Sequence, residues 1–179
     1  MKNVELATLK QGEVFKIGEH DFIVLKQREG ETDVISKNLM AEDVMFDNDT
    51  RDYNNSQLKE LIENEIQPVI EAAVGADKLV EHEVDLASVD MQNEFGTCRC
   101  KVRVLTFDEA RKHNDLLVNK ELPDWYWTLT PWSTKERGWG YSLAVVSPSG
   151  SISSSDCSNC FGVRPFCILK SNIFVSKED

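Results

Sequence analysis

The sequence lacks the features that mark membrane-spanning, exported and disulfide-stabilised proteins. No apolar run approaches the roughly 18 residues that a membrane helix needs. Residues 1–6 show neither the apolar stretch nor the small-residue cleavage site of a signal peptide. The five cysteines are odd in number and unevenly spaced, which argues against a disulfide framework. We therefore expect a cytoplasmic protein that makes no membrane contact.

Motifs of the common catalytic and metal sites are also missing. There is no Gly-x-Ser-x-Gly elbow, no glycine-rich phosphate loop and no His-Glu-x-x-His pair. Asp47-Asn48-Asp49 with Asp52 hints at calcium, but the glutamate that ends an EF-hand loop is missing. We therefore predict a protein that is not an enzyme and that has no catalytic residue, no metal and no cofactor.

The cysteines leave two chemical alternatives open. Cys157 and Cys160 form a Cys-x-x-Cys pair, and Cys98 and Cys100 could add two thiolates for zinc if the two distant segments met. The Cys157 and Cys160 pair could instead serve as a redox or catalytic dithiol. We favour ordinary thiols, because Cys-x-Cys is a less usual zinc pair and no second Cys-x-x-Cys is present.

The net charge of −11 is concentrated in the middle of the chain. Residues 42–94 hold 15 acidic and 3 basic residues, a net of −12, whereas the residues before them contribute −1 and those after them +2. Such a surface repels phosphates, so direct binding to nucleic acid is not expected. It would attract a protein with a basic surface, including a surface built to hold nucleic acid. The alternative is a solvated helix surface that serves solubility.

Length and composition fit one α+β domain with a real core, since 41% of the 179 residues are hydrophobic. Short β-branched and aromatic runs separated by Gly18 and Gly30 predict an opening β-meander. The predicted parts are the meander (1–41), an acidic helical segment (42–94) and a tryptophan-rich part (95–179).

A helix is predicted in the acidic segment. Asn55 or Ser56 can cap its start, apolar residues then recur at helical spacing, and Gly75 is placed to end it. Pro68 lies inside the pattern and should kink or divide the helix.

The tryptophan-rich part predicts alternating strands, turns and one short helix. Thr106 and Glu109 fit a capping box that begins a helix reaching about Val118. Pro165 marks an irregular position in the last strand. We expect strands at 101–105, 141–147, 151–153 and 162–169, and a polar loop at 153–156.

Several pieces in order resemble an uncharacterised bacterial and phage domain family. They are Asn55-Ser56-Gln57-Leu58, Leu105-Thr106-Phe107-Asp108-Glu109-Ala110, Trp125-Tyr126-Trp127, Ala144-Val145-Val146 with Gly150, and Gly162-Val163-Arg164-Pro165. The family looks like a C-type-lectin-like fold. It is similar to the variable domains of diversity-generating retroelements and, more remotely, to formylglycine-generating enzymes.

This resemblance implies a twisted antiparallel sheet, two helices and long loops, and a scaffold that displays those loops. It does not imply a reaction. It also implies that Arg164 is buried and paired. Where the family has Trp-x-Arg-Ser, this chain has Trp127-Thr128-Leu129-Thr130, so the family's arginine is absent.

Three functions follow as hypotheses. The first is an acidic inhibitor of phage or mobile-element type, which binds a basic host protein, for example an RNA-guided nuclease, in the manner of an anti-CRISPR protein. The second is a ligand- or receptor-binding display domain, since exposed aromatics beside arginine are typical of protein interfaces. The third is a cysteine-dependent enzyme. The candidate partner-binding residues are Trp132, Arg137, Trp139 and Tyr141 in an aromatic loop, Ser154, Asp156 and Asn159 in a serine-rich loop, and Glu60, Glu63 and Glu71 on the acidic helix.

Overall fold

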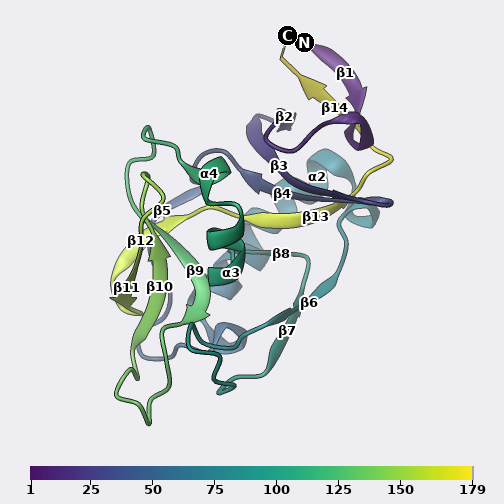
Figure 1. Ribbon diagram of the computed structural model, residues 1–179. Helices are drawn as coiled ribbons and strands as arrows, with labels where there is room; N and C mark the ends of the chain where they lie inside the picture. The colour runs from purple at the N-terminus through teal and green to yellow at the C-terminus, as the bar shows by residue number, and fades with distance from the viewer. Residues whose placement is uncertain (179) are drawn as a thin grey trace.

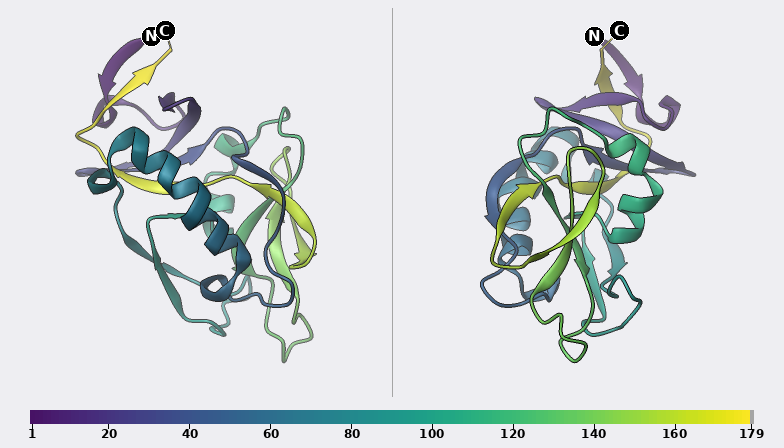
Figure 2. Two further views of the ribbon diagram at one scale, coloured as in Figure 1. Left: turned by 180° about the vertical axis from the view of Figure 1, so that it is seen from behind. Right: turned by 60° about the vertical axis from the view of Figure 1, so that its left-hand side comes forward.

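Two β-sheets, a long helical segment and a short helical pair make up the α+β fold of the computed structural model, which describes residues 1–178 (Figure 1). The first and last strands pair with each other, so the two ends of the chain lie together (Figure 2). No helix among the described residues is long and apolar enough to cross a membrane.

The larger sheet has seven strands and joins the two ends of the sequence. The predicted meander forms its centre, and strands from the C-terminal part flank that meander on both sides. In spatial order the strands are β1 (Lys2–Glu5), β14 (Phe174–Lys177), β2 (Val14–Ile17), β3 (His20–Arg28), β4 (Glu31–Ser36), β13 (Phe166–Lys170) and β8 (Val102–Arg103).

The smaller sheet has five strands and carries the tryptophan-rich part. All of its pairings are antiparallel except the short parallel contact of β12 with β9. In spatial order the strands are β11 (Ile152–Asp156), β10 (Ser142–Val146), β9 (Tyr126–Pro131), β12 (Cys160–Val163) and β5 (Ala41–Met45). A separate hairpin pairs β6 (His82–Asp85) with β7 (Thr97–Cys100).

The helical segments begin and end where local chemistry predicts. The Ser56 hydroxyl accepts a hydrogen bond from the Lys59 amide, and Gly75 ends the long segment with a φ of +93°. This segment is α1 (Gln57–Leu61), one π-helical stretch (Ile62–Ile66) and α2 (Gln67–Val74), so the division predicted around Pro68 is confirmed. The capping box of Thr106 and Glu109 opens α3 (Phe107–Lys112), which α4 (Asn114–Leu117) follows.

Helices cover both faces of the larger sheet, which explains the unbroken apolar run in β3. Phe22 and Val24 pack in the cluster that includes Ile66 of the long helical segment. Ile23 and Leu25, on the opposite face, pack in the cluster that contains residues of α3 and α4. Because successive side chains of a strand point to opposite faces, a sheet buried on both sides needs apolar residues at every position.

Arg164 joins the two sheets. It lies between β12 of the smaller sheet and β13 of the larger one, fully buried, and Pro165 follows it. Its guanidinium donates to the carbonyl oxygens of Ser36 (2.8 Å) and Leu117 (2.7 Å) and to the Tyr126 hydroxyl (3.2 Å). These bonds hold a buried charge without a carboxylate, although Nη2 of the same guanidinium has no hydrogen-bond partner among residues 1–178. The structural role expected for Arg164 is therefore seen, with neutral oxygens as the partners.

Three predicted element boundaries were wrong. The strand expected at 162–169 is two strands in different sheets, because Arg164 and Pro165 turn the chain between them. The polar loop expected at 153–156 is part of β11, whose backbone pairs in regular register with β10. The strand expected at 101–105 is limited to β8. Tertiary pairing overrides the weak strand propensity of serine in β11.

Candidate protein-binding surface

The aromatic loop projects from one end of the smaller sheet, between β9 and β10 (Figure 1). The Trp132 amide donates to the Ser142 carbonyl at 2.9 Å and closes the base of the loop. Trp139 is 42% exposed and Tyr141 is 57% exposed, whereas Trp132 is half-buried. The ring centroids of Trp132 and Trp139 lie 6.5 Å apart, so the two tryptophans support each other.

Asp90 fastens this loop from a distant part of the sequence. Its Oδ2 accepts hydrogen bonds from the Ser133 hydroxyl (2.6 Å) and from Arg137 Nη1 (2.8 Å). The Ser88 hydroxyl donates to the other carboxylate oxygen. Hydrogen bonds from the hydroxyls of Ser133 and Ser88, and to a smaller extent from Arg137, hold the pKa of Asp90 well below its usual range. The carboxylate is therefore ionised, and the contact persists, throughout the neutral and mildly acidic range.

Arg51 and Glu94 make a second attachment beneath the loop. Arg51 is only 3% exposed, and its Nη1 donates to the Ser133 carbonyl at 2.6 Å. Its Nη2 donates to Glu94 at 2.7 Å, and the other oxygen of Glu94 accepts from the Lys135 amide at 3.2 Å. Contacts from Arg51, Asp90 and Glu94 thus fix the loop before any partner arrives, which reduces the entropy lost on binding. We call these three residues the loop clamp.

Met91 extends the exposed apolar surface beside the clamp. It has a φ of +59°, a conformation that is rare for a residue with a side chain, and its side chain is 70% exposed. Three of the seven exposed large hydrophobic residues among residues 1–178 are Met91, Trp139 and Tyr141. We define the aromatic-loop surface as Met91, Trp132, Arg137, Trp139 and Tyr141.

The serine-rich candidate residues divide between a strand and a turn. Ser154 lies in β11 and is half-buried, whereas Asp156 and Asn159 are exposed. The Asp156 carboxylate accepts from the amide and the hydroxyl of Ser158, and these bonds lower its pKa. The Cys157 amide donates to the Tyr141 carbonyl at 2.7 Å, so this turn begins next to the end of the aromatic loop. The structure therefore brings the two predicted loops together.

The acidic candidate residues differ in how far they are free to meet a partner. Glu60 is exposed, and its carboxylate makes no hydrogen bond or ion pair within residues 1–178. Glu63 binds Lys59 at 2.5 Å, and Glu71 accepts from the Gln67 amide group at 2.8 Å. The long helical segment that carries them lies along a different face from the aromatic loop (Figure 2, left).

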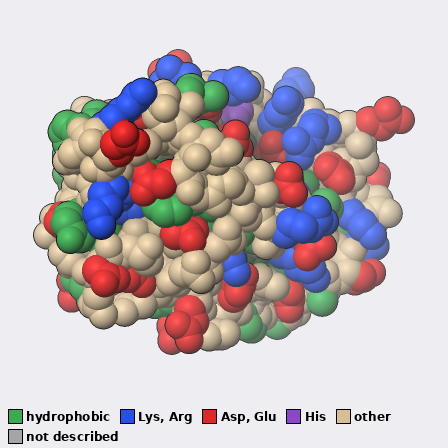
Figure 3. Space-filling model, turned by 90° about the horizontal axis from the view of Figure 1, so that it is seen from below, with side chains coloured by type: hydrophobic (Ala, Val, Ile, Leu, Met, Phe, Trp, Pro, Cys, Tyr) green, Lys and Arg blue, Asp and Glu red, His purple; other side chains and the backbone are tan. Residues whose placement is uncertain are grey.

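Part of the negative charge of residues 42–94 is used in contacts within the protein. Asp47 is used internally: burial opposes its ionisation, yet the amides of Asp49, Thr50 and Gln57 lower its pKa. Asp90 and Glu94 belong to the loop clamp. On the face that Figure 3 shows, Lys and Arg side chains lie among the Asp and Glu side chains. A count of charge along the sequence therefore overstates the acidic area that a partner could meet.

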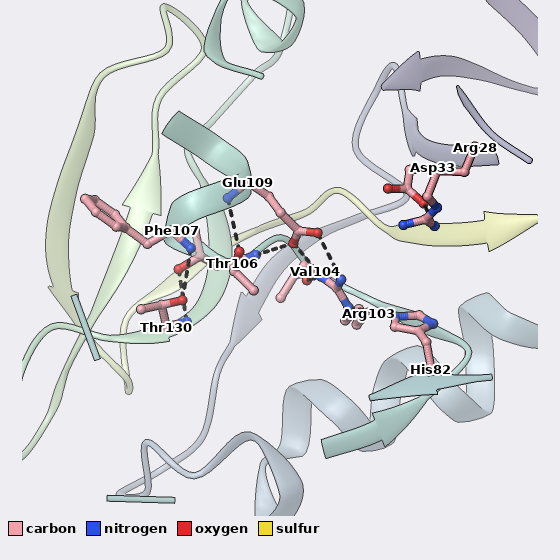
Figure 4. Close-up of polar contacts among 10 residues, drawn as sticks. Arg28, Asp33, His82, Arg103, Val104, Thr106, Phe107, Glu109 and Thr130 are labelled. Atoms are coloured by element: carbon pink, nitrogen blue, oxygen red, sulfur yellow. Dashed lines mark hydrogen bonds and ion pairs between the residues drawn. The ribbon is translucent and has the colours of Figure 1, made fainter. Parts of the chain in front are cut away.

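A buried ion pair supports the hairpin that leads to Met91 (Figure 4). Arg103 is 4% exposed, and its two terminal nitrogens donate to both oxygens of Glu109 at 2.6 and 3.0 Å. Its Nε donates to His82 Nε2 at 2.9 Å, and His82 Nδ1 lies 3.0 Å from the Val80 carbonyl. Burial lowers the pKa of His82. His82 is therefore neutral, with Nδ1 as the donor to Val80 and Nε2 as the acceptor.

The cysteines are the candidates that the sequence offers for zinc or for a reactive dithiol. Cys98, Cys100, Cys157 and Cys167 are buried and Cys160 is exposed, and all five are free thiols. Burial raises the pKa of Cys157 to about 11, which disfavours the reactive thiolate. No group of three or more His, Cys, Asp or Glu side chains in the described chain is placed to hold a metal.

No family model, no curated protein and no solved structure matches this chain. The C-type-lectin-like resemblance therefore stays a prediction, and function must be inferred from the site itself.

The sequence identified the aromatic loop but missed the loop clamp and Met91. Arg51, Asp90 and Glu94 are ordinary charged residues of the middle segment, separated from the loop by some 40 to 80 positions. Their contacts arise only when distant segments meet, so no local pattern marks them. The low frequency of basic residues in that segment is the one available signal, because it makes Arg51 stand out.

Proposed function

We propose that this chain is a non-enzymatic protein-binding module that contacts a protein partner through the aromatic-loop surface. The observation that carries the proposal is the loop clamp, which binds Arg137 and orders the loop that carries exposed Trp139 and Tyr141. Interfaces are enriched in tryptophan, tyrosine, methionine and arginine, and all four types occur here. A loop that is ordered in this way loses less conformational entropy on binding than a mobile one.

The proposal includes a scaffold of C-type-lectin-like type, from phage or mobile elements, that works in the cytoplasm. On such a scaffold, loops at one end of a sheet bear the binding residues. The proximity of Tyr141 to the turn containing Asp156 and Asn159 supports this arrangement, since both loops can then contact one partner. Binding then requires no catalytic residue and no cofactor.

A second candidate function is inhibition of a basic host protein, with an RNA-guided nuclease as the specific example. This second function is favoured by the exposed carboxylates of Glu60 and Glu65, which make no hydrogen bond or ion pair within residues 1–178. Lys59 is the sole basic residue in residues 57–74, and Glu63 already neutralises it. A positively charged nucleic-acid channel would meet little repulsion from this helix. The net charge of −11 disfavours direct contact with nucleic acid itself.

The test begins with a pull-down from the natural host at two salt concentrations, followed by affinity measurements with the purified partner. The combined change Trp139→Ala and Tyr141→Ala should weaken binding by about 30-fold or more, which corresponds to about 2 kcal/mol for two anchor residues. The matched helix variant, Glu60→Gln with Glu63→Gln and Glu71→Gln, should bind nearly as tightly as the original chain.

The reverse result separates the two candidates. Loss of binding in the helix variant, with full binding in the Trp139 and Tyr141 variant, would establish the acidic helix as the interface. Binding that weakens steeply with salt would point the same way. For the nuclease example, unchanged target cleavage at saturating protein would eliminate inhibition.

A further inference from the structure

A small hollow opens beside the aromatic-loop surface. It has a volume of about 140 Å³, and Met91 forms part of its wall. Val89 and Ala87 line it from the same segment, while Phe107 lines it from the start of α3. These apolar side chains can cover the aliphatic part of a long side chain.

The charged residues that line the hollow are both acidic. Asp85 and Asp108 line it, both are exposed, and no Lys or Arg is among its lining residues. Asp85 Oδ1 accepts from the Ala87 amide at 2.9 Å, and its other oxygen makes no bond within residues 1–178. Asp108 binds Arg111 at 2.5 Å, but both side chains are more than 60% exposed, so that pair is weak.

Three backbone amides near the hollow are already bonded within the protein. The amides of Thr106 and Glu109 are bound within the capping box, at 2.9 and 3.1 Å, and the Phe107 amide donates to the Thr130 hydroxyl at 2.9 Å (Figure 4). Thr130 is 3% exposed and lines the hollow, and its oxygen retains a lone pair that can accept a further hydrogen bond. The charged groups left to a ligand are therefore two carboxylates, with the hydroxyls of Thr106 and Thr130 beside them.

We propose that this hollow receives a lysine or arginine side chain of the protein partner. The apolar wall covers the aliphatic stem, while Asp85 and Asp108 bind the charged end. The inference rests on the proposed function, because Met91 belongs to both the hollow and the aromatic-loop surface. It adds that a basic side chain of the partner must lie next to the site that contacts Trp139 and Tyr141.

The test uses small probes and needs no partner. The ¹⁵N-labelled chain is titrated with N-acetyl-lysine N-methylamide and N-acetyl-arginine N-methylamide, and with the uncharged N-acetyl-norleucine N-methylamide as the matched control. Both basic probes should produce saturable shifts at the amides of Ala87, Phe107 and Thr130, and the norleucine probe should bind several-fold more weakly. Equal binding of all three probes, or no saturable shift, would overturn the inference.

Variants locate the charge effect. Asp85→Asn keeps the acceptor oxygen for the Ala87 amide. It should weaken binding of the basic probes by about two- to fivefold, and Asp108→Asn should do the same. Arg111→Gln releases Asp108 from its present partner and should strengthen binding. Glu136→Gln, an exposed change on the aromatic loop outside the hollow lining, should have no effect. Equal weakening by Glu136→Gln would show attraction by overall charge and would overturn the inference.

The outcome is distinguishable from failure of the proposed function. If the Asp85→Asn variant still binds the partner but the combined Trp139→Ala and Tyr141→Ala variant does not, the hollow inference fails and the binding function stands. If the basic probes bind at the hollow but the Trp139 and Tyr141 variant binds the partner normally, the hollow does take basic side chains and the proposed binding surface is wrong.

Discussion

The aromatic loop and the acidic helix use the same kind of side chain in opposite ways. Beside the aromatic loop, Asp90 and Glu94 bind groups of the loop itself. On the helix, Glu60 and Glu65 extend into solvent and bind nothing within residues 1–178. The carboxylates beside the aromatic loop order that loop, whereas the carboxylates on the helix are only exposed to solvent. A surface that is already ordered is the better candidate for specific binding.

The two regions also differ in what stabilises them. The helix is held from beneath by apolar residues such as Ile62, Ile66 and Ile70, which belong to the main core. Its charged face can therefore change with little effect on the fold. Among the described residues, none of residues 132–141 belongs to a buried apolar cluster, and polar contacts to the loop clamp hold the loop instead. Removing a clamp residue should consequently disturb the loop more than removing a helix carboxylate disturbs the helix.

The largest expected effect belongs to Arg51→Met. This change removes the buried guanidinium under the loop and leaves the Ser133 carbonyl without its donor. It also leaves Glu94 without its ion-pair partner. We expect a loss of about 1–3 kcal/mol in the free energy of unfolding, measured by urea denaturation, because buried polar groups lose their partners.

Lys59→Met is the matched control for that measurement, since it breaks the helix pair with Glu63. It should cost about 0.5 kcal/mol or less, the usual value for a pair of this spacing. Equal losses in the two variants would show that the clamp is no stronger than a surface pair, and the contrast between the regions would disappear.

Local sequence chemistry predicts much of this fold. Ser56, Thr106 with Glu109, and Gly75 mark helix ends through bonds and backbone angles that involve near neighbours. The exposure of Trp139 among glycines and charged residues could be expected in the same way.

Contacts between distant segments escaped prediction. The pairing of β1 with β14 joins the two ends of the chain, and no pattern in either end specifies the partner. Only the fold explains why position 162 requires glycine, since a Cβ there would clash with a methyl carbon of Leu39. The loop clamp belongs to this class. For that reason the sequence located the aromatic loop but not the groups that order it.

Acid should destabilise the fold through His82, which begins the hairpin that leads to Met91. Burial, and after it the charge of Arg103, lowers the pKa of His82, so the unfolded chain takes up a proton there more readily than the folded chain. Stability should therefore fall as the pH drops below the ordinary histidine value of about 6.5.

His82→Gln tests this dependence, because a glutamine oxygen can accept from Arg103 Nε without titrating. Between about pH 7.5 and about pH 5.5, its free energy of unfolding should fall less steeply than that of the original chain. Part of the slope should remain, since burial also lowers the pKa of His113. Identical slopes would mean that His82 does not contribute to the acid sensitivity.

A smaller effect is expected from Asp90→Asn. The amide retains one acceptor oxygen but loses the charge that binds Arg137. Global stability should change little, because the site is at the surface. Hydrogen exchange at the amides of Arg137, Gly138 and Trp139 should become faster, while exchange along α2 should be unchanged. Unaltered exchange in the loop would show that Arg51 and Glu94 suffice to order it.

The smallest effect should come from Glu60→Gln with Glu65→Gln. Neither carboxylate has a partner within residues 1–178, so the free energy of unfolding should stay within about 0.5 kcal/mol of the original value. Affinity for the partner should be equally unaffected if the aromatic-loop surface binds it. If stability is unchanged but affinity falls and loses its dependence on salt, these exposed charges contact the partner directly. The ordered loop would then be a structural feature, and the acidic inhibitor would become the better description of this protein.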